Sequence, residues 1–491
     1  MDEARIKQLS LEGERLEAFK ANYAADMLQL DGLSDNIGGS GEAGDTIKVC
    51  VRIRPPNPLD DSDVCAWQWD RQTVSLVRPS RRSSIRLDPN DMASAPYDMT
   101  LPSFTFDYLF HPEDDNSQIY NDLGKNIVAK ALEGYHGCIF TYGQTASGKT
   151  FTMNGTARSP GLIPHASFDI FEMIEAIPDR VYSVRLAYLE LYREQVLDLL
   201  NPDVSASERI KIQFDPKLGT VITGLCEEPV SSPQQIMVLL QRGEALRHVG
   251  ATDMNEKSSR AHTIFRLLIE SKSRDSSDLV VRKSTLNLID LAGSENARMT
   301  NAIGDRAKEA KFINQSLLTL STIIQRLGEV RSGGGHLPFR DSKLTRILQD
   351  PLSGNSVIAI ICTISTSLRC ADETTNTLKF AARAKKITLS RATINEHMDD
   401  KSLIRHYENE ISSLKSMVSE LMSRLQHSAA ANTVGPIIKS SVAKLIESME
   451  RYMEKAKASL GDSGNVIDEL RMHELEVQTM LTDIKEKIEN A

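Results

Sequence analysis

The stretch GQTASGKT, residues Gly143–Thr150, decides the fold that this sequence predicts. It lies between an apolar run, CIFTY, and a run, FTMNG, that continues as a helix. Its glycines let backbone N–H groups approach phosphates, and the helix N-terminus adds partial positive charge. Lys149 is placed to reach the β- and γ-phosphates, and the Thr150 hydroxyl to ligate Mg²⁺. The pattern favours a nucleoside triphosphate loop over its alternative, a glycine-rich turn with a chance lysine.

A loop of this kind needs an acidic residue at the end of an apolar strand, where it holds the magnesium shell. The run STLNLIDLAGSE supplies Asp290 at such a position. Gly293 follows, and its backbone N–H is placed to sense a terminal phosphate. An aspartate that ends a strand is often only a turn residue. Beside a phosphate loop, however, the magnesium role is the better interpretation of Asp290.

A third polar motif, NEKSSRAHTIF at residues 255–265, lies between the first two. It places Ser258, Ser259 and Arg260 directly before a β-rich run. Taken alone, it is typical of a serine-rich surface loop.

Composition bounds the class of protein. The chain has 491 residues, about 40% of them hydrophobic and 25% charged, as in globular proteins. No apolar run reaches the roughly 20 residues that a spanning helix needs, and the N-terminus lacks the apolar core of a signal peptide. We therefore expect a cytoplasmic protein with no membrane insertion.

The formal net charge of −9 does not suggest a nucleic-acid partner. None of the six scattered cysteines forms a C-x-x-C pair, so we expect reduced, buried thiols.

Periodicity divides the chain into five parts. Residues 1–45 predict an amphipathic helix and a flexible glycine linker, and residues 46–386 alternate β-rich and helical runs. This alternation predicts an α/β fold, with a central sheet and helices on both faces, in which VIAIICTIS is a central buried strand. Residues 387–400 form an extended linker, residues 401–427 a coiled coil, and residues 428–491 further helical or coiled-coil segments. The heptads place apolar residues at Ile404, Tyr407, Ile411, Leu414, Val418, Leu421 and Leu425.

The three motifs GQTASGKT, NEKSSRAH and DLAGSE resemble those of kinesin motor domains in order and spacing. RIRP, GLIP and FRDSKLTRIL are similar to further kinesin motifs, and the resemblance covers roughly residues 47–386. HTIFR, KFINQSL and the run after the motor are most similar to the centromere-associated (centromere protein E type) group. The resemblance implies a P-loop NTPase fold of the kinesin motor type, an ATP hydrolase activity and Mg²⁺ as cofactor.

The same resemblance implies roles for residues in the three motifs. Ser258 and Ser259 would hold the attacking water and the magnesium shell, so Thr150, Ser259 and Asp290 form the expected metal site. Arg260 would pair with Glu295 when the two sensor loops close over ATP, and Gly293 would contact the terminal phosphate. ATP would be held by Gly143, Gln144, Thr145, Ala146, Ser147, Gly148, Lys149 and Thr150. Adenine would lie by Arg52, Arg54, Pro55 and Phe151, although strand-end packing is an alternative role for Phe151.

The implied partner is the microtubule. Residues 301–350 carry eight basic and five acidic residues, a local excess that suits the acidic surface of tubulin. By similarity the contacts lie on the helix with Lys311 and at Arg340, Lys343 and Arg346, while Gln315 stands where many kinesins have lysine. A solvated basic face is the alternative.

Movement is also implied by the resemblance. A helix beginning near Ala310 would shift and dock the linker that starts at Ile387. The heptads after the motor favour a homodimer and plus-end movement along microtubules, in the cytoskeleton or at the mitotic spindle in chromosome-related transport; a single helix folded back on its motor is the alternative. Other functions left open are minus-end movement, depolymerisation and non-motile crosslinking. The cargo is unknown from the sequence.

Overall fold

The computed structural model describes residues 47–56, 65–77, 102–201, 203, 209–215, 219–249, 258–275, 280–295, 305–329, 337–389 and 392–398. The predicted N-terminal helix and the heptads lie outside this part of the chain. Two compact units are distinguished, Met1–Ser271 with Arg282–Asn395, and Lys272–Val281 with Glu396–Ala491. In the second unit the described residues are the ends of two long strands and strand β15 (Glu396–Met398).

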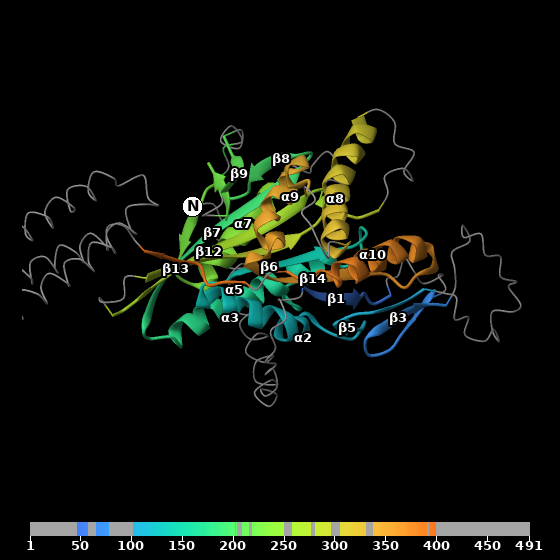
Figure 1. Cartoon of the computed structure of the whole chain (residues 1–491), viewed down its shortest axis with the longest axis horizontal. Coiled ribbons are helices and arrows are strands. Elements are labelled where there is room, and N and C mark those ends of the chain that lie inside the picture. The colour runs from blue at the N-terminus through green and yellow to red at the C-terminus, as the bar shows by residue number, and fades with distance from the viewer. Residues whose placement is uncertain are drawn as a thin grey trace, which may run out of the picture. The chain divides into compact units, whose positions relative to one another are not determined.

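A mixed sheet organises the first unit, with strands in the order β11-β7-β12-β13-β6-β14-β1-β5 (Figure 1). From one edge to the other these strands are β11 (Glu228–Val230), β7 (Arg180–Tyr192), β12 (His262–Ser273), β13 (Val280–Asp290), β6 (His136–Tyr142), β14 (Ser356–Ile364), β1 (Lys48–Ile53) and β5 (Tyr108–Phe110). Strand β8 (Gln195–Asp198) pairs with β7 in a hairpin. Two small sheets lie apart from it: β2 (Trp67–Trp69), β3 (Thr73–Leu76) and β4 (Ser103–Thr105), and β9 (Lys211–Asp215) with β10 (Gly219–Thr223).

Helices cover both faces of this sheet. One face packs against α8 (Asp305–Glu329), α9 (Lys343–Ile347) and α10 (Ala371–Ala384). The other packs against α2 (Asn116–Ile119), the π turn η2 (Tyr120–Gly124), α3 (Lys125–Glu133), α4 (Lys149–Met153), α5 (Leu162–Glu175) and α7 (Pro233–Val249). Short helical turns are η3 (Ser258–Arg260), η5 (Phe339–Asp341), η6 (Pro351–Asn355) and η7 (Leu368–Cys370).

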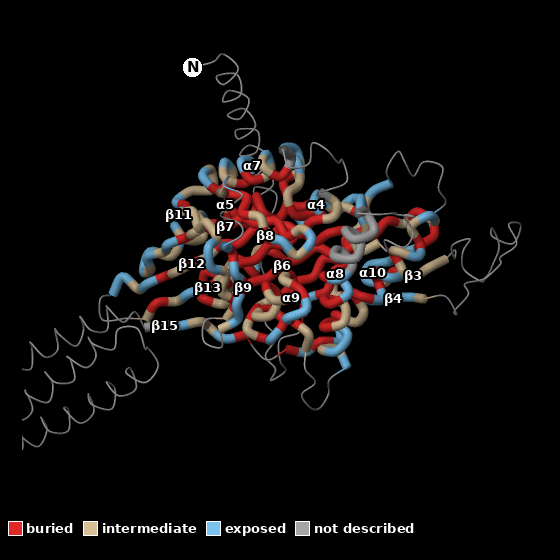
Figure 2. Tube along the Cα trace, turned by 90° about the horizontal axis from the view of Figure 1, so that it is seen from above, coloured by how far each residue is buried: buried red, intermediate tan, exposed pale blue. Residues whose placement is uncertain are grey.

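The core follows from the period-two pattern of the strands. In β14, Ile358, Ile360 and Cys362 face the α8–α10 side, whereas Ala359 and Ile361 face the α3–α5 side. Side chains of successive strand residues point to opposite faces, so a strand that is apolar throughout must be covered on both. Figure 2 shows the buried residues concentrated along the sheet, between the two helix layers. The predicted α/β fold and the central position of VIAIICTIS are confirmed.

Two helix boundaries differ from the sequence expectation. The segment after Asn116 is a helix interrupted by the π turn Tyr120–Gly124, where the Tyr120 ring occupies the space beside Gly124. Helix α8 begins at Asp305 rather than near Ala310. Its first residues, DRAKEA, contain no large apolar side chain, and the apolar period that indicates a helix in the sequence begins only with Phe312 and Ile313.

Candidate functional site

Four neighbouring parallel strands end at the same edge of the sheet, and this edge carries the sequence motifs. Strands β13, β6, β14 and β1 pair in parallel, with Asp290 opposite Thr141 and Ile53 opposite Ile364. Loops at the carboxyl ends of such strands form the usual binding crevice of open α/β sheets. The tertiary fold thus brings together the GQTASGKT, DLAGSE and RIRP motifs, which lie up to 243 residues apart along the chain (52 to 295).

The phosphate loop folds between β6 and α4 in a conformation that its glycines permit. Gly143 has φ of 155° and Gly148 has φ of 105°, and a Cβ atom on Gly143 would collide with the Thr363 carbonyl. The Ser147 hydroxyl lies 2.6 Å from the Thr363 hydroxyl, which fixes the loop to the end of β14. Thr145, Ala146 and Thr150 are exposed along the loop. The loop is therefore open to a ligand at these residues, and a phosphate could replace Glu295 as the acceptor of the Thr145 N–H.

Lys149 is buried beneath this loop. Its ammonium group donates to the Gly143 carbonyl at 2.9 Å and to the Gln144 carbonyl at 2.8 Å. Burial lowers the pKa of Lys149, while the charges of Asp290 and Glu295 raise it. A phosphate group would stabilise the charged ammonium more strongly than two neutral carbonyls do.

Two of the three residues that the sequence predicts to hold magnesium, Thr150 and Asp290, are adjacent. The Thr150 hydroxyl donates to Asp290 Oδ2 at 2.5 Å, and the Thr141 hydroxyl donates to Oδ1 at 3.2 Å. Burial raises the pKa of Asp290, and Lys149 with the two hydroxyl donors lowers it. A hydroxyl beside a carboxylate is a hard oxygen donor set of the kind that Mg²⁺ takes beside phosphates. The residues present therefore fit this ion.

We expect Thr150→Ala to raise the Mg²⁺ concentration that supports half-maximal turnover by about tenfold, because the substitution removes one oxygen donor and frees the Asp290 carboxylate. A titration of ATP turnover against free Mg²⁺ measures this. Thr156→Ala is the matched control, since Thr156 is exposed in the turn after α4 and contacts only Ser159 among the bonds described. An unchanged Mg²⁺ requirement in Thr150→Ala would contradict the assignment.

The two predicted sensor loops are the segments NEKSSRAH and DLAGSE, and a backbone hydrogen bond joins them. The Gly293 N–H donates to the Ser259 carbonyl at 2.9 Å, and the Ser294 N–H donates to the Gly143 carbonyl at 3.0 Å. Glu295 accepts from the Thr145 N–H at 2.8 Å and also from the Thr145 hydroxyl. The carboxylate of Glu295 thus lies on the phosphate loop, and its pairing with Arg260 stays a prediction.

The expected adenine residues divide into exposed and buried ones. Pro55 is exposed and Phe151 is 39% exposed, so both are open to a base. Arg52 is only 5% exposed; its guanidinium lies over the Phe151 ring and donates to Asn116 at 2.5 Å and Thr152 at 2.8 Å. Burial lowers the pKa of Arg52 to about 10. Arg52 therefore packs against one face of the Phe151 ring.

Sequence reasoning did not identify one polar residue of this site and one polar residue that lies outside it, behind the DLAGSE loop. Thr141 bonds Asp290 from β6, and His262 at the start of β12 accepts a hydrogen bond from the Ala292 N–H at 2.9 Å. Both are polar residues inside β-rich runs, in CIFTY and HTIF. Such interruptions are the available signal, because a buried polar group needs a partner. Ser258 lies in η3, but its side chain is outside the described residues.

Comparisons with known proteins agree with this geometry. The kinesin motor domain family matches residues 52–387. The chain belongs to the kinesin motor domain family. Kinesin-related protein 11 of Dictyostelium discoideum is 47% identical over 329 residues, which are 65% of this chain and 47% of that protein. The Arabidopsis thaliana kinesin-like protein KIN-7N is 38% identical over 427 residues, 87% of this chain and 49% of that protein. This kinesin chain spans about half the length of these relatives.

Solved structures show the same motor fold. A fast kinesin superimposes with a TM-score of 0.62 at 34% identity, over 72% of this chain and 95% of that one. A KIF14 dimer, in its two-heads-bound state with AMP-PNP and in complex with a microtubule, gives a TM-score of 0.63 at 31% identity, over 73% and 98%. The Dictyostelium and Arabidopsis relatives carry kinesin-related and KIN-7 names. Neither name is that of the predicted centromere-associated group.

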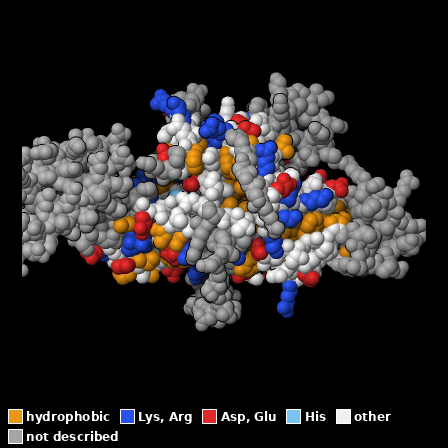
Figure 3. Space-filling model, viewed as in Figure 1, with side chains coloured by type: hydrophobic (Ala, Val, Ile, Leu, Met, Phe, Trp, Pro, Cys, Tyr) orange, Lys and Arg blue, Asp and Glu red, His pale blue; other side chains and the backbone are white. Residues whose placement is uncertain are grey.

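The residues predicted to contact the filament lie in η5, in α9 and in α8. Arg340 is exposed in η5, Lys343 is half-buried, and the Arg346 guanidinium donates to the Ile212 carbonyl of β9 at 3.2 Å. Gln315 of α8 donates to the Asp341 carbonyl at 3.1 Å. Figure 3 shows Lys and Arg side chains around the position of α8 and α9 in Figure 1, interspersed with acidic and hydrophobic side chains. The Lys311 side chain lies outside the described residues. Of the three described basic residues, Arg340 is the most available to a partner.

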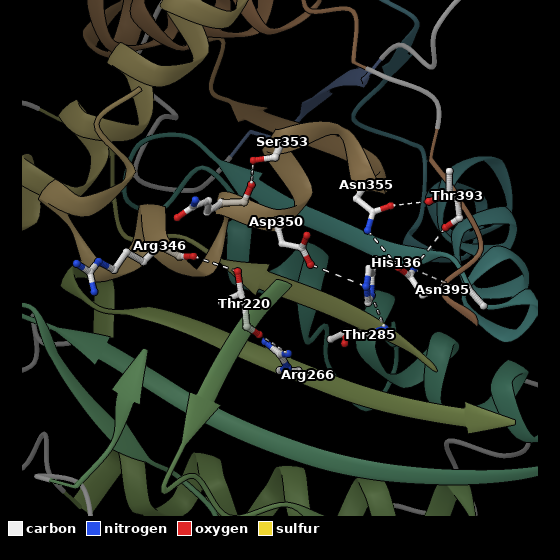
Figure 4. A network of polar contacts seen from close by, with 12 residues as sticks. His136, Thr220, Arg266, Thr285, Arg346, Asp350, Ser353, Asn355, Thr393 and Asn395 are labelled. Atoms are coloured by element: carbon white, nitrogen blue, oxygen red, sulfur yellow. Dashed lines mark hydrogen bonds and ion pairs between the residues drawn. The ribbon is translucent and has the colours of Figure 1, made fainter. Parts of the chain in front are cut away.

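The linker after α10 follows the first unit in an extended path. Ile387, Leu389 and Ala392 are buried, and none of the described residues from 387 to 395 is helical. Asn395 donates from its backbone to the Gly134 carbonyl at 3.0 Å, and its side-chain oxygen accepts from Asn355 at 3.1 Å. Figure 4 shows Thr393 and Asn395 beside Asn355, close to His136 and Asp350.

Among the described residues, no helix combines the length and the apolar character needed to cross a membrane.

Proposed function

We propose that this chain is an ATP hydrolase that converts hydrolysis into movement along microtubules. The convergence of Lys149, Thr150 and Asp290 with the Gly293–Ser259 backbone bond supports this proposal most directly. Phosphoryl transfer needs positioning and charge stabilisation rather than covalent help from the protein. The site offers both, since a buried lysine, oxygen donors and backbone amides surround one point at the sheet edge.

In the proposed cycle the chain's own groups orient the reactants. Lys149 and the loop amides bind the β- and γ-phosphates, and Ser258 and Ser259 hold the attacking water in line. Thr150, Ser259 and Asp290 would hold Mg²⁺, which when bound neutralises phosphate charge. Arg260 and Glu295 then close the site by pairing, which requires Glu295 to leave Thr145. That exchange makes closure depend on the nucleotide.

The proposed track is the microtubule, which the KIF14 neighbour binds. Arg340 and Lys343 would meet its acidic surface through salt-sensitive contacts. Shifts of α8 would then control the docking of residues 387–395, whose contacts with Asn355 and Gly134 offer a docked position.

Direction, dimerisation and subgroup are further parts of this proposal. The heptads after the motor support a homodimer and plus-end movement, and the KIN-7 relatives support a place within that group. The motif similarity to the centromere-associated kinesins supports a spindle role, with localisation on cytoskeletal microtubules.

Steady-state ATP turnover with and without microtubules, combined with gliding of polarity-marked microtubules, tests the proposal. We expect turnover to rise with microtubules and filaments to glide with their minus ends leading. Stimulated turnover with filament shortening would favour a depolymerising kinesin, and binding without turnover would favour a crosslinker. Turnover that is the same with and without microtubules would refute the proposal.

We expect Arg340→Ala to raise the microtubule concentration for half-maximal ATPase by about twofold to fivefold at unchanged maximal rate, because an exposed charge pair contributes under about 1 kcal/mol. The difference should shrink as salt is added. Arg158→Ala is the control, since Arg158 is an exposed arginine between α4 and α5, on the opposite helix layer. Equal behaviour of the two variants would argue against a filament contact at Arg340.

A further inference from the structure

His262 joins three parts of the motor. Its ring Nδ1 accepts from the backbone N–H of Ala292, and its Nε2 lies 2.9 Å from the hydroxyl of Ser316 in α8. His262 is the first residue of β12 and follows η3 after one intervening residue, so its ring links the chain just after η3 to the DLAGSE loop and to α8. Both His262 and Ser316 are 3% exposed.

The Ala292 contact belongs to a series of three. Successive N–H groups of Ala292, Gly293 and Ser294 donate to the His262 ring, the Ser259 carbonyl and the Gly143 carbonyl, at 2.9, 2.9 and 3.0 Å. Each neighbouring amide of the DLAGSE loop is thus held by a different element. A shift of one peptide unit must disturb the partner of the next, because adjacent amides share backbone dihedrals.

The protonation state of the ring is fixed by its partners. An N–H donor at Nδ1 requires that nitrogen to be unprotonated, so Nε2 carries the hydrogen and donates to Ser316. Burial and the nearby charge of Lys149 lower the pKa of His262 to about 3. The ring is therefore neutral at physiological pH and acts as a rigid spacer with one acceptor and one donor.

We propose that His262 is a positioning residue that transmits displacement of the DLAGSE backbone to helix α8 through Ser316. The inference rests on the proposed motor function and adds a specific mechanical link to it. In that function the Gly293 N–H must leave the Ser259 carbonyl to reach a terminal phosphate, and this movement pulls on the adjoining Ala292 peptide. The ring has two rotatable bonds and is almost fully buried, so it moves with Ala292 or loses a buried hydrogen bond.

The path continues beyond Ser316. Gln315, the preceding residue of α8, donates to the Asp341 carbonyl next to Arg340. The same turn of α8 is therefore bonded inward to His262 and outward to the predicted filament face. Nucleotide state and filament binding would meet in this turn, and each would bias the position of the other.

Two substitutions isolate the two ends of this link. Ser316→Ala removes the α8 end and leaves the ring in place. His262→Asn keeps an acceptor close to the position of Nδ1, since the Asn side-chain oxygen extends as far from Cβ as Nδ1, but it cannot reach Ser316. Thr322→Ala is the matched control, because the Thr322 hydroxyl donates to the Leu318 carbonyl of its own helix at 2.8 Å.

We expect Ser316→Ala and His262→Asn each to lower the maximal microtubule-stimulated turnover about fivefold, with turnover in the absence of microtubules within about twofold of the unmodified chain. The double variant should be no slower than His262→Asn alone, because both substitutions break one link. Thermal melting of each variant separates lost coupling from lost folding. Thr322→Ala should behave as the unmodified chain.

Three outcomes would overturn the inference. Ser316→Ala could match Thr322→Ala in stimulated turnover, the effects of the two substitutions could multiply in the double variant, or basal and stimulated turnover could fall together. If the unmodified chain is not stimulated by microtubules, the proposed function fails and the inference with it. If the unmodified chain is stimulated and Ser316→Ala is equally so, only the inference fails.

Discussion

Lys149→Ala is expected to abolish measurable ATP turnover and all filament gliding, with a loss of at least about 100-fold to 1,000-fold. Lys149 lies under the loop, and its ammonium group donates to the carbonyls of Gly143 and Gln144, where the phosphates are predicted to bind. Its removal leaves those carbonyls facing the phosphates without a compensating charge. Turnover in saturating microtubules and a gliding assay measure the result.

The control is Lys48→Ala, which removes an exposed lysine at the start of β1. It should leave turnover unchanged. Lys149→Met preserves the length of the buried side chain and lacks its charge, so it separates packing from electrostatics and should be as inactive as Lys149→Ala. A Lys149→Ala chain that still glides microtubules in ATP would end the enzymatic interpretation.

Gly293→Ala should reduce microtubule-stimulated turnover by about 100-fold or more while ATP affinity changes only a few-fold. A Cβ atom on Gly293 would collide with the Thr145 hydroxyl and with both carboxylate oxygens of Glu295. The methyl group would displace the amide that is predicted to contact the terminal phosphate. It would also push the Glu295 carboxylate away from Thr145. Lys149 and the loop glycines are untouched, so ATP would still bind.

Equilibrium binding of a fluorescent ATP analogue, compared with single-turnover hydrolysis, separates these two effects. The melting temperature of Gly293→Ala should stay close to that of the unmodified chain, because the colliding groups are the ends of an exposed side chain, Thr145, and a half-buried one, Glu295. Near-normal hydrolysis by Gly293→Ala would show that the close approach at Gly293 is not needed for closure. A matched loss of binding and hydrolysis would place Gly293 in ATP binding instead.

Much of the fold was readable from local patterns. The run VIAIIC, residues 357–362, is apolar on both faces of an extended chain, as expected for a strand covered on both faces, and β14 is such a strand. The loop GQTASGKT specified its own conformation, because glycine tolerates the positive φ found at Gly143 and Gly148. Where local chemistry dictates local structure, as in these two segments, the sequence was sufficient.

Contacts between distant segments were not readable in the same way. Three features depend on neighbours that the order of residues along the chain does not reveal. They are the Glu295–Thr145 hydrogen bond, the packing of Arg52 on the Phe151 ring and the start of α8 at Asp305. The bridge from Ala292 through His262 to Ser316 joins three elements over 54 residues. By itself the sequence determined the chemical groups and the strand and loop that carry the phosphate site. Only the tertiary structure decided which polar groups pair, because a buried hydrogen bond depends on where two separate backbones meet and not on the residue types alone.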